Sequence, residues 1–74
     1  MSTYIDRLKI EYSDLELKLT KLEDFLATET FTALANVDKI LLEKQFGIMT
    51  EYSRVLNTRI RRAEQDKFEG ADWI

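Results

Sequence analysis

Seven apolar residues recur at alternating spacings of three and four near the start of the chain, and this pattern most constrains the fold. They are Ile5, Leu8, Tyr12, Leu15, Leu19, Leu22 and Leu26. Such spacing is a heptad seam, the apolar stripe along which one α-helix packs on another. Thr3 and Asp6 form a weaker relative of the capping box that begins many helices. We therefore predict a helix over about residues 3–27.

A second apolar pattern predicts another long helix over about residues 37–65. Its apolar residues come in adjacent pairs seven apart, which are Leu41/Leu42, Ile48/Met49 and Val55/Leu56. One seam needs only one residue at each level, so two side by side make a stripe wide enough for two neighbours. We expect one neighbour to be the first helix and the other to be a helix of a second subunit. The alternative is a single bulky partner.

Three polar residues, Gln45, Tyr52 and Arg59, fall between these pairs and are also seven apart. Polar residues in a seam lower stability and often fix register or oligomeric state. We interpret Gln45 and Tyr52 in this way. For Arg59 a role in register and a role in a ligand site both stay open.

The segment that joins the helices, residues 28–36, is predicted to form the apex of a hairpin with a short helical turn. Its threonines are poor residues for a helix interior, and Asn36 is a good N-cap for the helix that follows. We expect Phe31 and Leu34 to fold back over the end of the apolar core.

The chain has no proline and two glycines, Gly47 and Gly70, which favours an all-α fold. We predict a single domain, an antiparallel hairpin of two long helices that assembles into a helical-bundle oligomer. The tail, residues 66–74, leaves the helix near Gly70. We expect its Trp73 and Ile74 to dock on a neighbouring subunit, because an exposed tryptophan lowers solubility.

Size and composition exclude several classes of protein. A chain of 74 residues buries too little surface to be more than marginally stable alone, and it has neither cysteine nor histidine. Disulfides and the usual zinc sites are thereby excluded, so self-association is the remaining source of stability. A net charge of −3 argues against duplex nucleic acid as a partner. No apolar run is long enough to span a membrane and no signal peptide is recognisable, so we expect a cytoplasmic protein.

The residues that could carry chemistry are few. Without histidine or cysteine, acid–base catalysis would fall to carboxylates or lysines, and the carboxylates follow the spacing of a solvated helix surface. The sequence contains no glycine-rich phosphate loop and no carboxylate spacing typical of a metal site. We expect a binding or structural protein, not an enzyme, that uses no cofactor and no metal.

Cations gather at the open end of the predicted hairpin. Antiparallel pairing brings Tyr4 level with Arg59, and Arg7, Lys9 and Arg54 lie at the same end. Guanidinium groups match the geometry of phosphate, and a tyrosine ring can stack on a base. The alternative is that these cations stabilise the end of a helix dipole and pair with acidic neighbours. For Tyr4, packing and ligand stacking stay equally open.

Two segments resemble small phage proteins: TYIDRLKIEYSDLELKLTKLEDFL, residues 3–26, and LLEKQFGIMTEYSRVLNTRI, residues 41–60. They are similar to the short helical proteins of crAss-like and other tailed phages, and to the hairpin domain of phage anti-CBASS sponges for cyclic oligonucleotides. The resemblance covers most of residues 3–63. It implies a hexamer of helical hairpins that sequesters cyclic di- and trinucleotide signals in the infected bacterium and breaks no bond.

The resemblance also implies roles for single residues. In the sponge family a tyrosine near the N-terminus stacks on a base, and a lysine early in the first long helix contacts phosphate. The segment DRLKIEYSDL aligns Lys9 with that lysine, and Tyr4 is the nearest candidate for the tyrosine. The chain lacks the longer N-terminal arm of the better-matched members. A second site, for trinucleotides, would use Lys44 or Arg54 of the later helix.

Two functions therefore compete. One is a sponge for cyclic oligonucleotides, with nucleotide-binding residues Tyr4, Arg7, Lys9, Arg54 and Arg59. The other is a helical module that binds a host or phage protein through its wide apolar stripe and its Trp73 tail.

Overall fold

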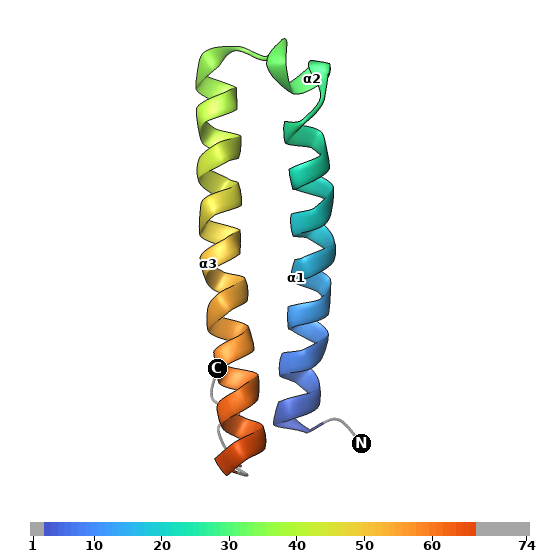
Figure 1. Cartoon of the computed structure of the whole chain (residues 1–74), viewed down its shortest axis with the longest axis vertical. Helices are drawn as coiled ribbons and strands as arrows, with labels where there is room; N and C mark the ends of the chain where they lie inside the picture. Colours follow the sequence, from blue (N-terminus) through green and yellow to red (C-terminus); the bar gives the residue numbers. More distant parts are fainter. Residues whose placement is uncertain (1–2, 67–74) are drawn as a thin grey trace.

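The computed structural model describes residues 3–66 and consists of three helices in a hairpin about 48 Å long and 18 Å across. Helix α1 spans Tyr4–Leu26, the short α2 spans Glu29–Thr32, and α3 spans Asn36–Asp66. The two long helices run antiparallel side by side, with α2 across the apex (Figure 1). The predicted all-α hairpin is confirmed, and the described part of the chain contains no strand.

The capping box predicted at the start of α1 is present. The side-chain oxygen of Thr3 accepts a hydrogen bond from the backbone N–H of Asp6 at 3.1 Å, and the carboxylate of Asp6 accepts one from the N–H of Thr3 at 3.4 Å. These two bonds satisfy donors that a helix start otherwise leaves unpaired. The cap fixes where α1 begins and thereby holds Tyr4 in its first turn.

The α1 seam packs on one member of each apolar pair of α3. Leu8, Leu15, Leu56 and Ile60 are buried together, and Met49 packs against them. The first members of the pairs point away from this core. They are Leu41, Ile48 and Val55, which are 59%, 61% and 51% exposed. The wide stripe therefore does divide into an inner half against α1 and an outer half that this hairpin leaves uncovered.

The prediction that Gln45 and Tyr52 lie in the seam is wrong. The buried residues that continue the seam are Ser53, between the second and third pairs, and Ile60, beyond the third, each 7% exposed. Each follows an inward residue of a pair by four positions and so shares its side of the helix. Gln45 and Tyr52 precede Phe46 and Ser53 by one residue, which turns them about 100° round the helix. Both are exposed, and Arg59 is half-buried beside the seam.

At the apex the predicted Phe31 is buried and the predicted Leu34 is half-buried, and Phe31 also forms an aromatic pair that the sequence did not predict. Phe31 is buried, and its ring meets that of Phe25 edge-on, with centroids 6.1 Å apart. Thr28 caps α2 by accepting the N–H of Phe31 at 3.2 Å. The N-cap predicted at Asn36 is displaced by one residue, because the backbone carbonyl of Ala35 accepts the first helical hydrogen bonds. A shift of one residue is within the normal spread of helix ends.

Trp73, Ile74 and Gly70 lie outside the described residues, as does most of the predicted tail. Within residues 3–66, no helix has the length and apolarity that crossing a membrane would require.

Leu56→Ala is expected to destabilise the hairpin by about 2–5 kcal/mol, because Leu56 is fully buried and the surrounding helices cannot close the cavity. That is a large share of the roughly 5–15 kcal/mol that folds a small domain. Denaturant unfolding followed by circular dichroism, at one fixed protein concentration, measures the loss. The neighbouring Asn57→Ala is the control, since Asn57 is exposed. Equal losses in both variants would contradict this packing.

Candidate ligand-binding groove

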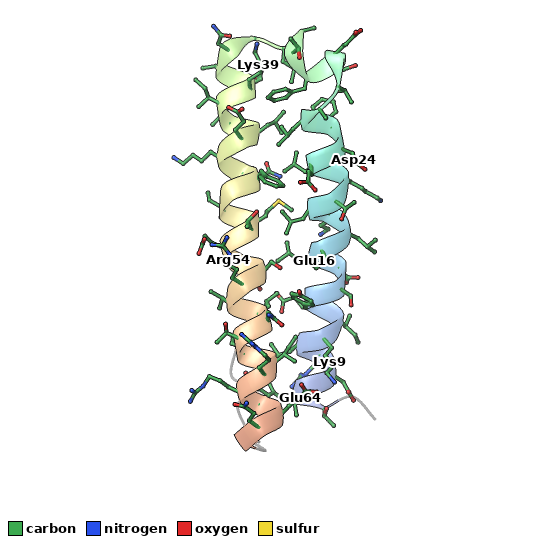
Figure 2. The ribbon with its side chains drawn as sticks, viewed as in Figure 1. Lys9, Glu16, Asp24, Lys39, Arg54 and Glu64 are labelled. Atoms are coloured by element: carbon green, nitrogen blue, oxygen red, sulfur yellow. The ribbon has the colours of Figure 1, made fainter. Side chains whose placement is uncertain are left out.

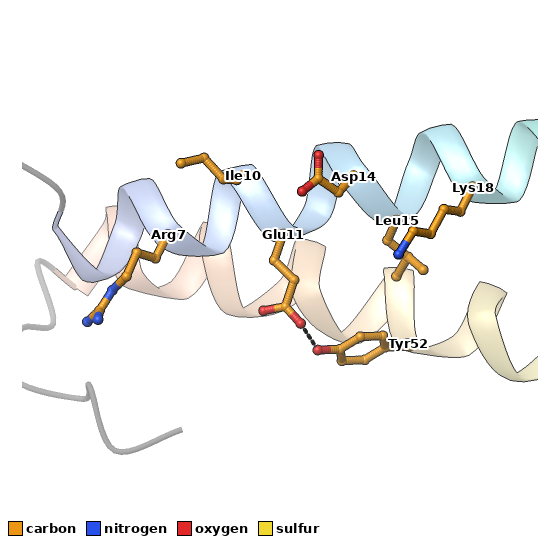
Figure 3. Close-up of a pocket in the computed structure, with 7 residues that line it drawn as sticks. All are labelled: Arg7, Ile10, Glu11, Asp14, Leu15, Lys18 and Tyr52. Carbon is orange, nitrogen blue, oxygen red and sulfur yellow. Dashed lines mark hydrogen bonds between the residues drawn. The ribbon is translucent and has the colours of Figure 1, made fainter.

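A groove of about 350 Å³ runs along one side of the hairpin, between α1 and Tyr52 of α3 (Figure 3). Its seven lining residues are Arg7, Ile10, Glu11, Asp14, Leu15, Lys18 and Tyr52. Four of them carry charge and follow one another at spacings of four, three and four along α1. This spacing makes a charged flank parallel to the apolar seam. The groove is thus the strip where that flank meets α3.

Tyr52 closes the α3 side of the groove. Its hydroxyl donates a hydrogen bond to the carboxylate of Glu11 across the two helices (Figure 3). This bond raises the pKa of the Tyr52 phenol above its usual value, because the neutral phenol is the donor. Partial burial of the ring and the nearby negative charge raise the pKa further. The contact holds the tyrosine ring against α1 instead of leaving it in solvent.

Tyr4, Arg7 and Arg59 form a cluster at the open end of the same side, called here the tyrosine–arginine cluster. Arg59 donates a hydrogen bond to the Tyr4 hydroxyl at 2.9 Å, and its guanidinium carbon lies 5.7 Å from the centroid of the Tyr4 ring. That distance is within the range of a cation–π contact. Arg7 follows Tyr4 by three residues and therefore shares its side of α1. The predicted level of Tyr4 with Arg59 is confirmed.

The cluster and the groove form one continuous surface. Arg7 belongs to both, and Tyr52 precedes Arg59 by seven residues, which is about two turns on the same side of α3. Within the groove the charges of Arg7 and Lys18 offset those of Glu11 and Asp14. Arg59 adds a positive charge at the open end. An anionic group is therefore favoured between Arg7 and Arg59, away from Asp14.

Lys9, which the sequence placed at this end, lies on another side of α1. It follows Arg7 by two residues, a turn of about 200° round the helix. Its ammonium binds the carboxylate of Glu64 at 2.8 Å, and both side chains are labelled in Figure 2. The hydrogen bond and the charge of Glu64 raise the pKa of Lys9 above its usual value.

Arg54 is separated from the groove in the same way. It follows Tyr52 by two residues and pairs with Glu51 of its own helix. Figure 2 shows Arg54 on the outer side of α3, away from α1. Of the five candidate residues, Tyr4 and Arg59 are in contact, Arg7 lines the groove, and Lys9 and Arg54 each form an ion pair elsewhere.

Sequence reasoning missed the groove itself and one polar contact between the two long helices, outside the groove lining. The signal for the groove was present as the spacing of Arg7, Glu11, Asp14 and Lys18, but the sequence pattern assigned the carboxylates to a solvated face and Arg7 to a separate cluster of cations. The second contact joins the buried Ser53 hydroxyl to the carboxylate of Glu16. No group of three or more acidic residues that could hold a metal ion occurs in the part of the chain that the structure describes.

Fold and groove together define a class: a small helical hairpin whose long helices share an open, charged groove beside a tyrosine–arginine cluster. The chain belongs to the Sequestin family, whose profile matches residues 2–62. It is also similar to an uncharacterized 7.5 kDa protein of the denB–rIIB intergenic region of Enterobacteria phage T4. The two are 38% identical over 60 residues, which covers 81% of this chain and 94% of the phage T4 protein. No solved structure matches the chain.

The family match covers every residue of the groove and of the tyrosine–arginine cluster. Together with the phage T4 relative, it places the chain among small phage proteins of the Sequestin family. The family name indicates sequestration of a ligand.

The pKa of Tyr52 is expected to lie above the value of about 10 found for an unperturbed tyrosine, because the Glu11 carboxylate accepts a hydrogen bond from the neutral hydroxyl. The difference in tyrosinate absorbance between the protein and Tyr52→Phe isolates this group from the other two tyrosines. Since the folded pKa is raised, the stability that Tyr52 contributes is complete below the unfolded pKa. It is lost as pH rises through the folded pKa. Glu11→Gln should lower the midpoint, and an unchanged midpoint would contradict the contact.

Proposed function

We propose that this protein binds and sequesters a small nucleotide signal without changing it chemically, and that cyclic di- and trinucleotides are its ligands. Its action would be to keep a defence signal of the infected bacterium away from the effector that reads it. The observation that carries the proposal is the tyrosine–arginine cluster in a chain of the Sequestin family.

The cluster supplies the two kinds of contact that a nucleotide needs. A tyrosine face stacks on a base in a sequence-tolerant way, and a guanidinium fork binds phosphate through two parallel hydrogen bonds. Tyr4 accepts one hydrogen bond from Arg59, while a guanidinium carries five donors. Holding Arg59 by its contact with Tyr4 reduces the entropy that binding a phosphate would otherwise cost.

Sequestration needs affinity for the ligand and no chemistry that converts it, and the residues of this surface suit both requirements. The groove presents two carboxylates, but Glu11 is engaged by Tyr52. The one hydroxyl among the seven lining residues is that of Tyr52, and its raised pKa makes it a weak nucleophile near neutral pH. A role as a protein-binding module is the second candidate, supported by the exposed Leu41, Ile48 and Val55 of α3.

A panel of nucleotides tests the proposal. Cyclic di- and trinucleotides are compared with linear dinucleotides, dinucleotides joined through pyrophosphate, and mononucleotides by thermal melting of the protein. A ligand at about 100 times its Kd adds about 2.7 kcal/mol of stability, so a domain of this size melts several degrees higher. The complex is then denatured by heating, and mass spectrometry of the released ligand should show that it is intact.

A shift specific to cyclic forms supports the proposal. A rise in melting temperature with pyrophosphate-linked dinucleotides alone would support sequestration, but of that class of ligand instead of cyclic nucleotides. The absence of any shift, or recovery of a cleaved ligand, would overturn it and favour the protein-binding module.

Arg59→Ala and Arg7→Ala should each weaken nucleotide binding about 10- to 100-fold, because a hydrogen bond to a charged group contributes about 1.5–3 kcal/mol. Arg54→Ala is the matched control, since it removes the same charge from the outer side of α3. Isothermal titration calorimetry with the best ligand of the panel measures all three. Equal losses in Arg54→Ala and Arg59→Ala would show only a general effect of charge and contradict the site.

Lys9→Ala distinguishes the phosphate contact that the resemblance implies for Lys9 from its ion pair with Glu64 in the hairpin. Lost binding with unchanged helicity and oligomer size would add Lys9 to the site as a phosphate contact. Unchanged affinity would leave Lys9 as the partner of Glu64.

A further inference from the structure

The outer half of the α3 apolar pattern is uncovered in the hairpin. Among the described residues, eight large apolar side chains are exposed and six apolar side chains are buried. Three of the exposed ones, Leu41, Ile48 and Val55, repeat every seven residues and form the α3 stripe. A continuous apolar row on a helix is typical of packing against another helix. A core this small also needs further burial to be stable.

We infer that the α3 stripe is an interface between two copies of this chain, packed antiparallel about a twofold axis at Ile48. Ile48 then meets its own copy, and Leu41 lies level with Val55 of the second copy. The spacing makes the stripe self-complementary, which a twofold interface requires.

Charge decides the direction of this pairing. Lys44 and Glu51 lie on one flank of the stripe, four residues before and three residues after Ile48, and both are exposed. In an antiparallel twofold pair the same flank of both stripes lies on one side of the interface, so Lys44 of each copy comes beside Glu51 of the other. In a parallel pair this flank would face Gln45 and Tyr52, which are neutral at pH 7. Only the antiparallel pair brings each Lys44 beside a carboxylate, that of Glu51, which already pairs with Arg54 of its own helix.

The other flank of the stripe borders the groove. It carries Gln45 and Tyr52, three residues before and four residues after Ile48, and Tyr52 closes the groove. The antiparallel pair brings Gln45 of the second copy beside Tyr52, so the second copy extends the groove wall. This part rests on the proposed function: a groove of about 350 Å³ is at the small end of ligand sites, and the second copy would enlarge it.

The cysteine-free chain allows a direct test of the interface by disulfide cross-linking. Under mild oxidation Ile48→Cys should form covalent dimers. Leu41→Cys alone should not, since an antiparallel pair separates the two copies of residue 41 by about 14 residues, or about 21 Å. A mixture of Leu41→Cys and Val55→Cys should form heterodimers. Leu17→Cys, at an equally exposed apolar position of α1, is the control.

The native protein should sediment as an even multiple of 8.7 kDa, the dimer being about 17 kDa. A monomer, an odd number of chains, or Ile48→Cys that cross-links no faster than Leu17→Cys would overturn the interface. Efficient cross-linking of Leu41→Cys alone would overturn its direction.

Ile48→Glu places two like charges at the twofold axis and should give a helical monomer. If the second copy extends the groove, this monomer binds the best nucleotide of the panel more weakly than the native protein does. Equal binding would overturn the shared groove and leave the proposed function standing. Cross-linking without any nucleotide binding would overturn the proposed function and leave the interface between the two copies standing.

Discussion

The apolar seam between α1 and α3 is the contact on which every other feature of this hairpin depends. Leu8, Leu15, Leu56 and Ile60 fix the level at which the two helices meet. That level brings Tyr4, in the first turn of α1, to Arg59 near the end of α3. Neither helix alone would hold a tyrosine and an arginine at this distance, because residues so far apart in sequence meet only through the packing between them.

The level of the helices could be predicted from the sequence, but their rotation could not. Alternating spacings of three and four located the seam of α1 and hence the partner of Tyr4. A repeat of seven identifies an apolar stripe along α3, but it does not indicate which edge of that stripe packs on α1. Gln45 and Tyr52 were therefore placed in the seam, where Ser53 in fact lies, held by Glu16. A single buried serine carries no apolar signal that a sequence pattern could detect.

Rotation also explains why Lys9 and Arg54 lie apart from Tyr4 and Arg59. Lys9 and Arg54 lie at the predicted end of the hairpin or near it, yet two residues along a helix turn a side chain to another face. Both form ion pairs on those other faces. The groove arises where the charged flank of α1 meets Tyr52, and its closing contact depends on a side-chain hydrogen bond across the two helices. Locating the groove therefore required the relative level of the two helices, their rotation and the positions of their side chains.

A two-dimensional amide NMR spectrum, recorded while a cyclic dinucleotide is added, tests the central claim most directly. The account predicts that the largest changes in chemical shift follow the surface from Tyr4 and Arg7 to Tyr52 and Arg59, and that a saturable Kd describes them. Unchanged spectra, or changes centred on the outer side of α3 at Arg54, would contradict a nucleotide site in this groove.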